Sequence, residues 1–249
     1  MGDLLDARRI GVVVPSVNTV IEGWYPYAVP AGVRVHVNRM LIGQTVTAAS
    51  LEEMDSHGME AAAALATCRP EVVVYGCTAS SLVGGREYDL YLLDTLRQAT
   101  GVTSLTTTES VLRALDHLGV TTLAVASPYT DELGRKEVEF FCATGHPVLG
   151  DAHLGISGGF ELASPSDADI LAVARRAWRN AGGGVDALFI GCMNLNSHRV
   201  LDALEAELGV PVVSATQASL WAALRAIGVS DVLKGYGTLL ADSRRVRGS

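Results

Sequence analysis

Two cysteines of the chain share one short pattern, a Gly-Cys pair at the end of an apolar segment. They are Cys77, which follows Gly76, and Cys192, which follows Gly191. Glycine lets the backbone turn sharply, and the positive end of a following helix would stabilise a thiolate placed at its start. Two thiols that face each other can act on one carbon, one as nucleophile or base and the other as proton donor. The pair therefore predicts nucleophilic or acid–base chemistry at cysteine.

The other two cysteines, Cys68 and Cys142, lie at a helix end and inside a helical pattern. We expect both to be buried packing residues, because free cysteine usually behaves as a small hydrophobic side chain. None of the four cysteines forms a C-x-x-C pair, and no H-E-x-x-H motif occurs. The sequence therefore predicts free thiols and no metal site.

An internal repeat brings the two Gly-Cys pairs into equivalent positions. Residues 72–77 and 187–192 follow one pattern, and their cysteines lie 115 positions apart. A period of this length indicates a duplicated lobe rather than a solenoid. We expect a first lobe over residues 1–120 and a second over residues 121–249, with the active site in the cleft between them. The C-terminal helix is able to cross over to the first lobe.

Short segments rich in β-branched residues alternate with helical patterns along the chain. Strands that are covered on both faces of a parallel sheet have this composition. The predicted strands cover residues 10–14, 33–37, 72–75, 123–126, 187–190 and 210–213. The predicted helices cover residues 51–67, 89–100, 109–118, 132–144, 165–181, 198–208 and 218–227. The alternation predicts an α/β fold of two pseudo-symmetric lobes, each a mostly parallel sheet flanked by helices.

Small polar residues directly follow four of the predicted strands, at residues 15–19, 76–80, 127–130 and 191–194. Ligands of open α/β sheets bind beyond the carboxyl ends of the strands. Backbone N–H groups and hydroxyls of such segments can hold an anion there. We therefore expect a small anionic ligand at this edge of each sheet.

The composition excludes several classes of protein. The 249 residues are 49% apolar and 18% charged with a net charge of −8, so we expect a folded protein with no affinity for nucleic acid. The longest basic run covers only residues 244–247. No apolar segment approaches the ~20 residues of a spanning helix, and the acidic residues 1–6 do not resemble a signal peptide. We expect no membrane contact and a cytoplasmic location.

Several motifs in order resemble one enzyme superfamily, that of the aspartate/glutamate racemases, and within it the maleate cis–trans isomerase and arylmalonate decarboxylase branch. The motifs are Pro15-Ser16-x-Asn18-Thr19-x-x-Glu22, Gly76-Cys77-Thr78, Ser127-Pro128-Tyr129-Thr130-Asp131-Glu132, Gly145-His146-Pro147-Val148, Leu154-Gly155-Ile156 and Gly191-Cys192-Met193-Asn194. The resemblance spans nearly the whole chain. It implies a homo-oligomeric enzyme that needs no cofactor and acts on a small carboxylic acid.

The resemblance also implies roles for eight residues. Cys77 would attack an alkene carbon to form a succinyl-cysteine-type adduct, and Cys192 would donate and accept a proton. The remaining six would bind the two carboxylates of a dicarboxylic acid. Of these, Asn18 and Tyr129 would hold one carboxylate, and Thr78 with the backbone N–H groups of Ala79, Met193 and Asn194 would hold the other. The function so implied is cis–trans isomerisation of the maleate-to-fumarate type.

Two departures keep alternatives open. Gly158-Gly159-Phe160 stands where the isomerases carry an Asp-Asn pair, and this stretch is more similar to the decarboxylases. The decarboxylases, however, have glycine in place of Cys77. Ala79 stands where the branch often has serine, and Ser80 or Ser81 would supply the missing hydroxyl. Racemisation or decarboxylation of a substituted malonate or amino-acid-like acid, including an ectoine-utilisation-type activity, is the alternative. A non-catalytic binding protein is a third alternative, and the two matching Gly-Cys turns oppose it because a binding protein would not need both thiols.

Overall fold

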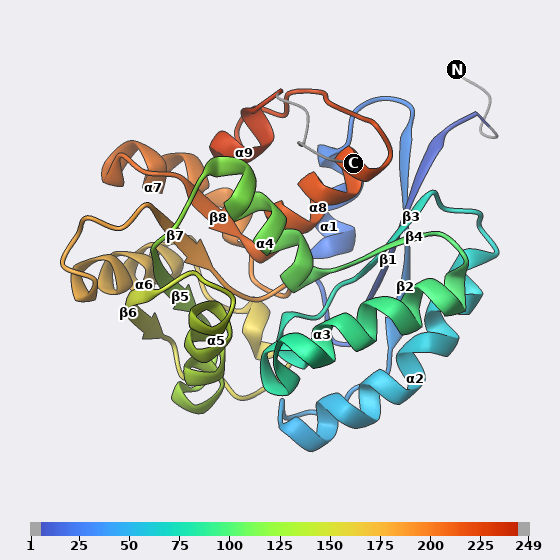
Figure 1. Ribbon diagram of the computed structural model, residues 1–249, viewed down its shortest axis with the longest axis horizontal. Coiled ribbons are helices and arrows are strands. Elements are labelled where there is room, and N and C mark those ends of the chain that lie inside the picture. The colour runs from blue at the N-terminus through green and yellow to red at the C-terminus, as the bar shows by residue number, and fades with distance from the viewer. Residues whose placement is uncertain (1–5, 244–249) are drawn as a thin grey trace.

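The computed structural model describes residues 6–243 as two parallel four-stranded sheets flanked by helices (Figure 1). The predicted α/β fold is thereby confirmed. The first five residues and the basic run at 244–247 lie outside the described residues. No helix among residues 6–243 is long and apolar enough to cross a membrane.

The first sheet has the strand order β2-β1-β3-β4, and every neighbouring pair is parallel. Its strands are β1 (Arg8–Pro15), β2 (Val33–Met40), β3 (Val72–Tyr75) and β4 (Thr103–Thr106). The helices of this half are α1 (Ile21–Ala28), α2 (Ala48–Ala66), α3 (Thr78–Thr100) and α4 (Thr107–Leu118). All four residues of β3 are buried, as its unbroken apolar sequence predicts.

The second sheet repeats this arrangement with the order β6-β5-β7-β8. Its strands are β5 (Leu123–Ser127), β6 (Val148–His153), β7 (Ala187–Ile190) and β8 (Val212–Ser214). The helical segments are α5 (Asp131–Ala143), η1 (Glu161–Ala163), α6 (Asp167–Asn180), η2 (Ser197–Arg199), α7 (Leu201–Leu208), α8 (Ala215–Ala226) and α9 (Gly237–Ala241). Strands β3 and β7, which carry the Gly-Cys pairs at their ends, therefore occupy the same place in their sheets.

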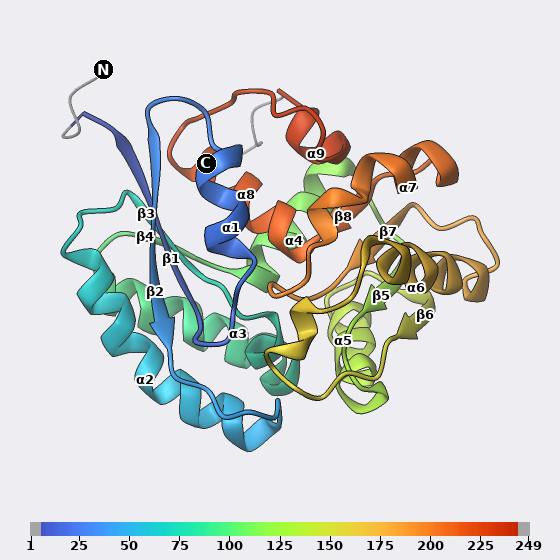
Figure 2. The ribbon, with the colours of Figure 1, turned by 180° about the vertical axis from the view of Figure 1, so that it is seen from behind.

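Helices α4 and α8 pack against each other between the two sheets (Figures 1 and 2). Helix α8 contacts β3 and β4 of the first sheet as well as β8, and α4 contacts β8 as well as β4. The Tyr25 hydroxyl on α1 donates to the backbone oxygen of Thr216 on α8 at 2.7 Å. Trp221 on α8 is fully buried in this layer. The two halves thus share one core, and the division of the chain at residue 120 stays a prediction.

The elements differ from the predicted ones in a few places. Strands β4 and β6 and helices α1 and α9 lie where the sequence patterns predict no element. Helix α3 begins at Thr78, directly after Cys77, instead of at residue 89. The correction matters for function, because it places Cys77 at the beginning of a helix.

Candidate active site

One cavity lies at the seam between the two halves, beyond the carboxyl ends of β1, β3, β5 and β7. Its volume is about 40 Å³. All eight residues predicted for the site line it, namely Asn18, Cys77, Thr78, Ala79, Tyr129, Cys192, Met193 and Asn194. The other lining residues are Pro15, Val17, Ile42, Val46, Leu51, Gly76, Gly159 and Leu162. The duplicated architecture therefore brings both predicted thiols to one space.

Cys77 is the N-cap residue of α3, and its backbone is extended with φ −134° and ψ 111°. The preceding Gly76 lies so close to β1 that a Cβ there would meet the backbone oxygen of Val13 at 3.0 Å. Hydrogen bonds from the backbone N–H groups of Ala79 and Ser80 favour the thiolate, but burial outweighs them and raises the Cys77 pKa to about 11. The helix start therefore favours the thiolate as expected, but burial is the larger effect and makes Cys77 less acidic than an ordinary cysteine.

Cys192 lies in a turn rather than at a helix start, because the next helical segment, η2, begins only at Ser197. The expected helix dipole at this thiol is therefore absent. Its backbone has φ +82°, a left-handed conformation that is strained for a residue with a Cβ and that recurs at functional sites. The N–H of Asn194 points at its sulfur at 3.3 Å. Burial raises the Cys192 pKa to about 12, against the hydrogen bonds from Asn194 and the Tyr129 hydroxyl.

The Thr78 side chain carries a hydroxyl without a partner in the cavity wall. Thr78 is only 2% exposed, and its Oγ1 makes no hydrogen bond to any described group. A buried hydroxyl without a partner is costly, and binding sites are where such groups are kept for a ligand. Thr78 is therefore ready to donate to a bound acceptor.

Asn18 and Asn194 connect the loops around the cavity. The Asn18 amide donates to the Met193 carbonyl oxygen at 2.9 Å, and its Oδ1 accepts from the N–H groups at the start of α1. The Asn194 amide donates to the Gly159 carbonyl oxygen at 3.0 Å, and its Oδ1 accepts from the Thr19 N–H at 2.9 Å. Both asparagines thus join segments of the two halves, a positioning role beyond the carboxylate binding that the resemblance implies. Each amide nitrogen of asparagine carries two N–H donors, and a single protein partner leaves Asn18 one for a ligand.

The Gly158-Gly159-Phe160 stretch closes the cavity through its backbone. The N–H of Gly159 donates to the backbone oxygen of Gln44 at 2.9 Å, and Gly158 pairs with Thr45 in an isolated bridge. Phe160 is 61% exposed and does not line the cavity. The apolar side chain that lines the cavity near this segment is Leu162, so Phe160 does not set the polarity of the site.

Ser80 and Ser81 do not replace the hydroxyl that is missing at Ala79. Neither lines the cavity, and each donates instead to a buried aspartate, Ser80 to Asp55 at 2.8 Å and Ser81 to Asp89 at 2.7 Å. The expectation for these two serines is therefore wrong. Both hydroxyls lie behind the cavity wall, which the first turn of α3 forms with Thr78 and Ala79.

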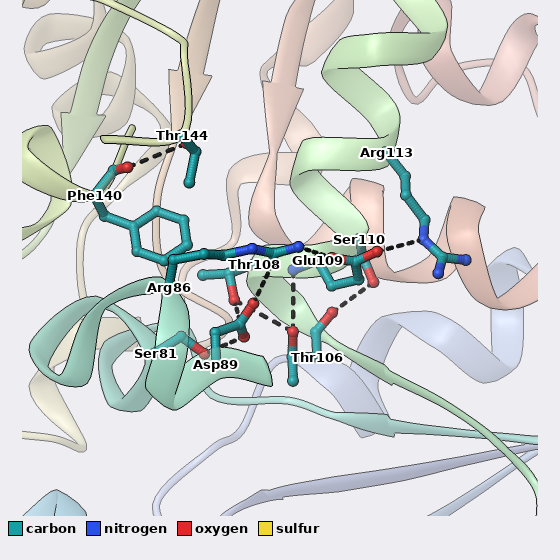
Figure 3. A network of polar contacts seen from close by, with 10 residues as sticks. All are labelled: Ser81, Arg86, Asp89, Thr106, Thr108, Glu109, Ser110, Arg113, Phe140 and Thr144. Carbon is teal, nitrogen blue, oxygen red and sulfur yellow. Dashed lines mark hydrogen bonds and ion pairs between the residues drawn. The ribbon is translucent and has the colours of Figure 1, made fainter. Parts of the chain in front are cut away.

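A polar network joins α3 to α4 away from the cavity lining (Figure 3). The helix is kinked at Gly85, where φ is +76°. Beyond the kink, Asp89 accepts from Ser81 and from Arg86, the latter at 2.6 Å, and Arg86 also donates to Glu109 on α4 at 2.7 Å. Arg86 thereby joins Asp89 of its own helix to Glu109 of α4. The network holds α3 against α4 beyond the kink.

The remaining cysteines do not belong to the site. Cys68 and Cys142 are exposed, which corrects the expectation that both are buried packing residues. Phe140 and Phe141 occupy the buried face of α5, and Cys142 turns to its solvent side. Within residues 6–243 no group of three or more His, Cys, Asp or Glu side chains is arranged to hold a metal ion.

Two buried carboxylates near the site were not among the predicted residues. Asp55 on α2 lies behind Cys77, and Glu137 on α5 lies beneath Gly191, where a Cβ would meet the Glu137 carboxylate at 2.2 Å. Burial raises the Glu137 pKa to about 8. Their positions in the helical pattern could have indicated that both are buried. Each stands on the apolar face of an amphipathic helix, Asp55 between Leu51 and Ala62 and Glu137 beside the two phenylalanines.

Fold and site define an α/β enzyme of two similar lobes with a pair of cysteines at their seam. The relatives of this chain agree with that class. The maleate isomerase of Nocardia farcinica is 29% identical over 97% of this chain and 99% of its own length. The arylmalonate decarboxylase of Bordetella bronchiseptica is 31% identical over 67% of this chain and 69% of its own. A model of the arylmalonate decarboxylase family matches residues 10–240, and the chain belongs to this family.

Solved structures give the same result. A variant of the Nocardia farcinica maleate cis–trans isomerase with a covalently bound succinylcysteine intermediate superimposes with a TM-score of 0.87 at 26% identity, over 94% of this chain and 98% of the other. Arylmalonate decarboxylase itself superimposes with a TM-score of 0.79 at 25% identity, over 94% and 99% of the two chains. The resemblance read from the sequence motifs is thereby confirmed.

Proposed function

We propose that the protein is a cofactor-independent cis–trans isomerase of a small dicarboxylic acid, of the maleate-to-fumarate type. The observation that carries the proposal is that Cys77 and Cys192 line one small cavity together with donors for carboxylates. The relative with a TM-score of 0.87 forms a succinylcysteine intermediate, which is the adduct of a thiol with a four-carbon diacid. The two thiols of this chain are suited to the same reaction.

The proposed reaction is an addition followed by an elimination. The Cys77 thiol gives its proton to a neighbouring base, its sulfur attacks one alkene carbon, and the neighbouring carbon takes a proton from the Cys192 thiol. The former double bond is then a single bond and rotates. The Cys192 thiolate removes a proton from the carbon that it had protonated, and the double bond forms again in the trans arrangement. The C–S bond breaks, and the departing sulfur takes its proton back from the base.

The charge state of the site supports a dianionic substrate. Burial raises the pKa of Cys77 to about 11 and of Cys192 to about 12, so both thiols are neutral near pH 7 and do not repel carboxylates. The unpartnered Thr78 hydroxyl and the free N–H of Asn18 would donate to the substrate, with the Tyr129 hydroxyl and the N–H groups of the two Cys loops. Such neutral donors stabilise the charge that develops on a carboxylate next to the attacked carbon.

Decarboxylation at the same site is less favoured. One relative of known structure is an arylmalonate decarboxylase in which a glycine was exchanged for cysteine, so the native decarboxylase has glycine there. This chain has Cys77 in the first-lobe turn and therefore carries both thiols that the addition needs. The exposure of Phe160 also removes the argument for an aryl-binding side chain in the 158–160 segment.

We further propose a cytoplasmic homo-oligomer. Exposed thiols such as Cys68 and Cys142 stay reduced in the cytoplasm. Large exposed side chains, among them Tyr27 and Tyr91, offer surface for contacts between copies of the chain. Light scattering on the purified protein would give its mass in solution, and a monomer would overturn this part of the proposal.

Proton NMR of maleate incubated with the enzyme tests the function. We expect the maleate signal to be replaced by that of fumarate, and no conversion with the Cys77→Ser variant. A folded wild-type protein that leaves millimolar maleate unchanged would overturn the proposal. Incorporation of deuterium into an α-aryl or α-amino acid by that same protein would then support the alternative activity.

A further inference from the structure

A buried aspartate lies behind Cys77 without a cation to balance it. Asp55 on α2 is 6% exposed, and none of the ion pairs among residues 6–243 includes it. Its carboxylate accepts from three hydroxyls, those of Tyr75, of Ser80 at 2.8 Å and of Tyr88 at 2.8 Å. A buried carboxylate with only neutral hydrogen-bond donors lowers the stability of the folded state. Its presence behind a reactive thiol therefore points to a functional role.

Ser80 connects this carboxylate to the thiol. Its Oγ lies 2.8 Å from Asp55 Oδ1 and 3.4 Å from Cys77 Sγ. A serine hydroxyl has one proton to donate and lone pairs to accept. When Ser80 donates to the Asp55 carboxylate, it can accept from the Cys77 S–H, and when Asp55 is protonated it can turn and donate to the sulfur. The three groups thus form one continuous path for a proton.

We propose that Ser80 and Asp55 form a buried proton relay that takes the thiol proton of Cys77 as its sulfur attacks the substrate. The inference rests on the proposed function for its substrate, but the relay itself concerns only the acidity of Cys77. In this role Ser80 and Asp55 are positioning and proton-transfer residues that never touch the substrate, since neither lines the cavity.

The step balances within the chain. The Cys77 proton moves to Ser80 Oγ while the Ser80 proton moves to Asp55 Oδ1, and the sulfur lone pair forms the C–S bond. The π electrons take the Cys192 proton, which leaves Asp55 neutral and Cys192 as the thiolate. When the adduct breaks down, Cys192 takes a proton back from carbon and Asp55 returns its proton to the departing sulfur through Ser80.

The groups around Asp55 favour such an exchange. Burial and the neighbouring charge of Glu52 raise the pKa of Asp55, and the hydrogen bonds from Tyr75, Ser80 and Tyr88 oppose this. The ionised carboxylate in turn raises the pKa of the Cys77 thiol. The state in which Asp55 and Cys77 are both ionised is therefore unfavourable. The stable state has one proton shared between the two groups.

The chain offers a matched control for the relay. Ser81 is the neighbouring residue on α3, is as deeply buried as Ser80 and also donates to a buried aspartate, Asp89. Of the two serine hydroxyls, that of Ser80 lies within hydrogen-bond distance of the Cys77 sulfur, at 3.4 Å, and that of Ser81 does not. Ser80→Ala and Asp55→Asn therefore test the relay, Ser81→Ala and Asp89→Asn control for the loss of a buried hydrogen bond, and thermal unfolding of each variant reports its fold.

The relay can be tested without any substrate. Cys77 is labelled with iodoacetamide at several pH values, and mass spectrometry of the peptide that contains it gives the labelling rate. Between about pH 7 and pH 9 we expect a nearly flat rate for wild type, because the internal transfer is independent of pH. In Ser80→Ala and Asp55→Asn only solvent can take the proton, so the rate should rise about tenfold per pH unit in both variants. At pH 7 it should be lower than in wild type in Ser80→Ala, which keeps the Asp55 charge that raises the thiol pKa. Ser81→Ala and Asp89→Asn should keep the wild-type profile.

The outcomes separate the relay from the proposed function. A flat profile in both relay variants, or a rising one in folded Ser81→Ala, would overturn the relay even if maleate is converted. The expected contrast in labelling together with inert maleate would retain the relay and overturn only the substrate. With maleate as substrate, kcat/KM of the relay variants should fall roughly 100-fold at pH 7 and recover as the pH rises.

Discussion

The Asn18 side-chain amide donates to the backbone carbonyl oxygen of Met193 at 2.9 Å, across 175 positions of the chain. It joins the loop after β1 to the turn that carries Cys192. The reciprocal contact, from the Thr19 N–H to Asn194 Oδ1 at 2.9 Å, closes a pair of hydrogen bonds between the two halves. The distance between the two thiols is thus set by contacts between loops as well as by the packing of α4 against α8.

Removal of this contact should affect stability and activity together. Asn18→Ala loses the bond to Met193 and the two acceptor contacts at the start of α1, and we expect a loss of about 1–3 kcal/mol in the free energy of unfolding. We also expect kcat/KM to fall at least tenfold, since the cavity loses a donor and its alignment. Asn38→Ala is the control, because Asn38 makes a similar bond to Ala61 far from the cavity. Equal activity of the two variants would contradict the role of Asn18.

Thr78→Val should weaken substrate binding without destabilising the protein. The Thr78 hydroxyl bonds to no group among residues 6–243, so its removal breaks no hydrogen bond. We expect the urea unfolding midpoint to stay the same or to rise. Loss of one donor to a charged carboxylate costs about 1.5–3 kcal/mol, which corresponds to a KM increase of roughly tenfold or more. A lower midpoint with unchanged KM would show that the hydroxyl serves the fold instead.

Glu137 should make stability depend on pH. Burial raises its pKa from the ordinary 4.5 to about 8, so the folded state holds this proton more tightly than the unfolded state does. The stabilisation is complete below pH 4.5 and is lost as the pH rises through 8, at up to about 1.4 kcal/mol per pH unit.

Glu137→Gln removes the titrating group and should reduce this slope. Urea unfolding at acid, neutral and alkaline pH measures it, and we expect the variant to gain stability over wild type mainly at the alkaline end. Glu139→Gln, on the exposed side of the same helix, is the control and should leave the slope as it is. A slope that is identical in Glu137→Gln and wild type would contradict the raised pKa.

The features that repeat along the chain can be predicted from the sequence. Those that depend on buried polar groups cannot. The unbroken apolar segments and the duplicated Gly-Cys turns predict β3, β7 and the thiol pair. Strand β4 has the sequence Thr-Ser-Leu-Thr, and Ser104 and Thr106 are buried in it because they bond locally, as Thr106 does when it accepts from the Glu109 N–H at 3.0 Å. Helix α1 contains Pro26, which opposes a helix in a pattern analysis.

The same reason explains what the site analysis missed. The role proposed for Asp55 depends on its hydrogen bonds from Ser80, Tyr75 and Tyr88, which lie on two other elements, β3 and α3. The exposure of Cys142 likewise follows from which face of α5 the neighbouring phenylalanines cover. Such contacts between distant segments leave no periodic signal in the chain.

Trapping of the adduct on Cys77 tests the paired-thiol account most directly. Cys192→Ser lacks the thiol that exchanges the proton, and peptide mass spectrometry after incubation with maleate should find one succinyl group on Cys77 and none on Cys68 or Cys142. Cys77→Ser should give no adduct, both variants should lose turnover by a factor of at least ~10³, and both should unfold near the wild-type temperature. Absence of the adduct from folded Cys192→Ser, together with wild-type turnover in either variant, would contradict the account.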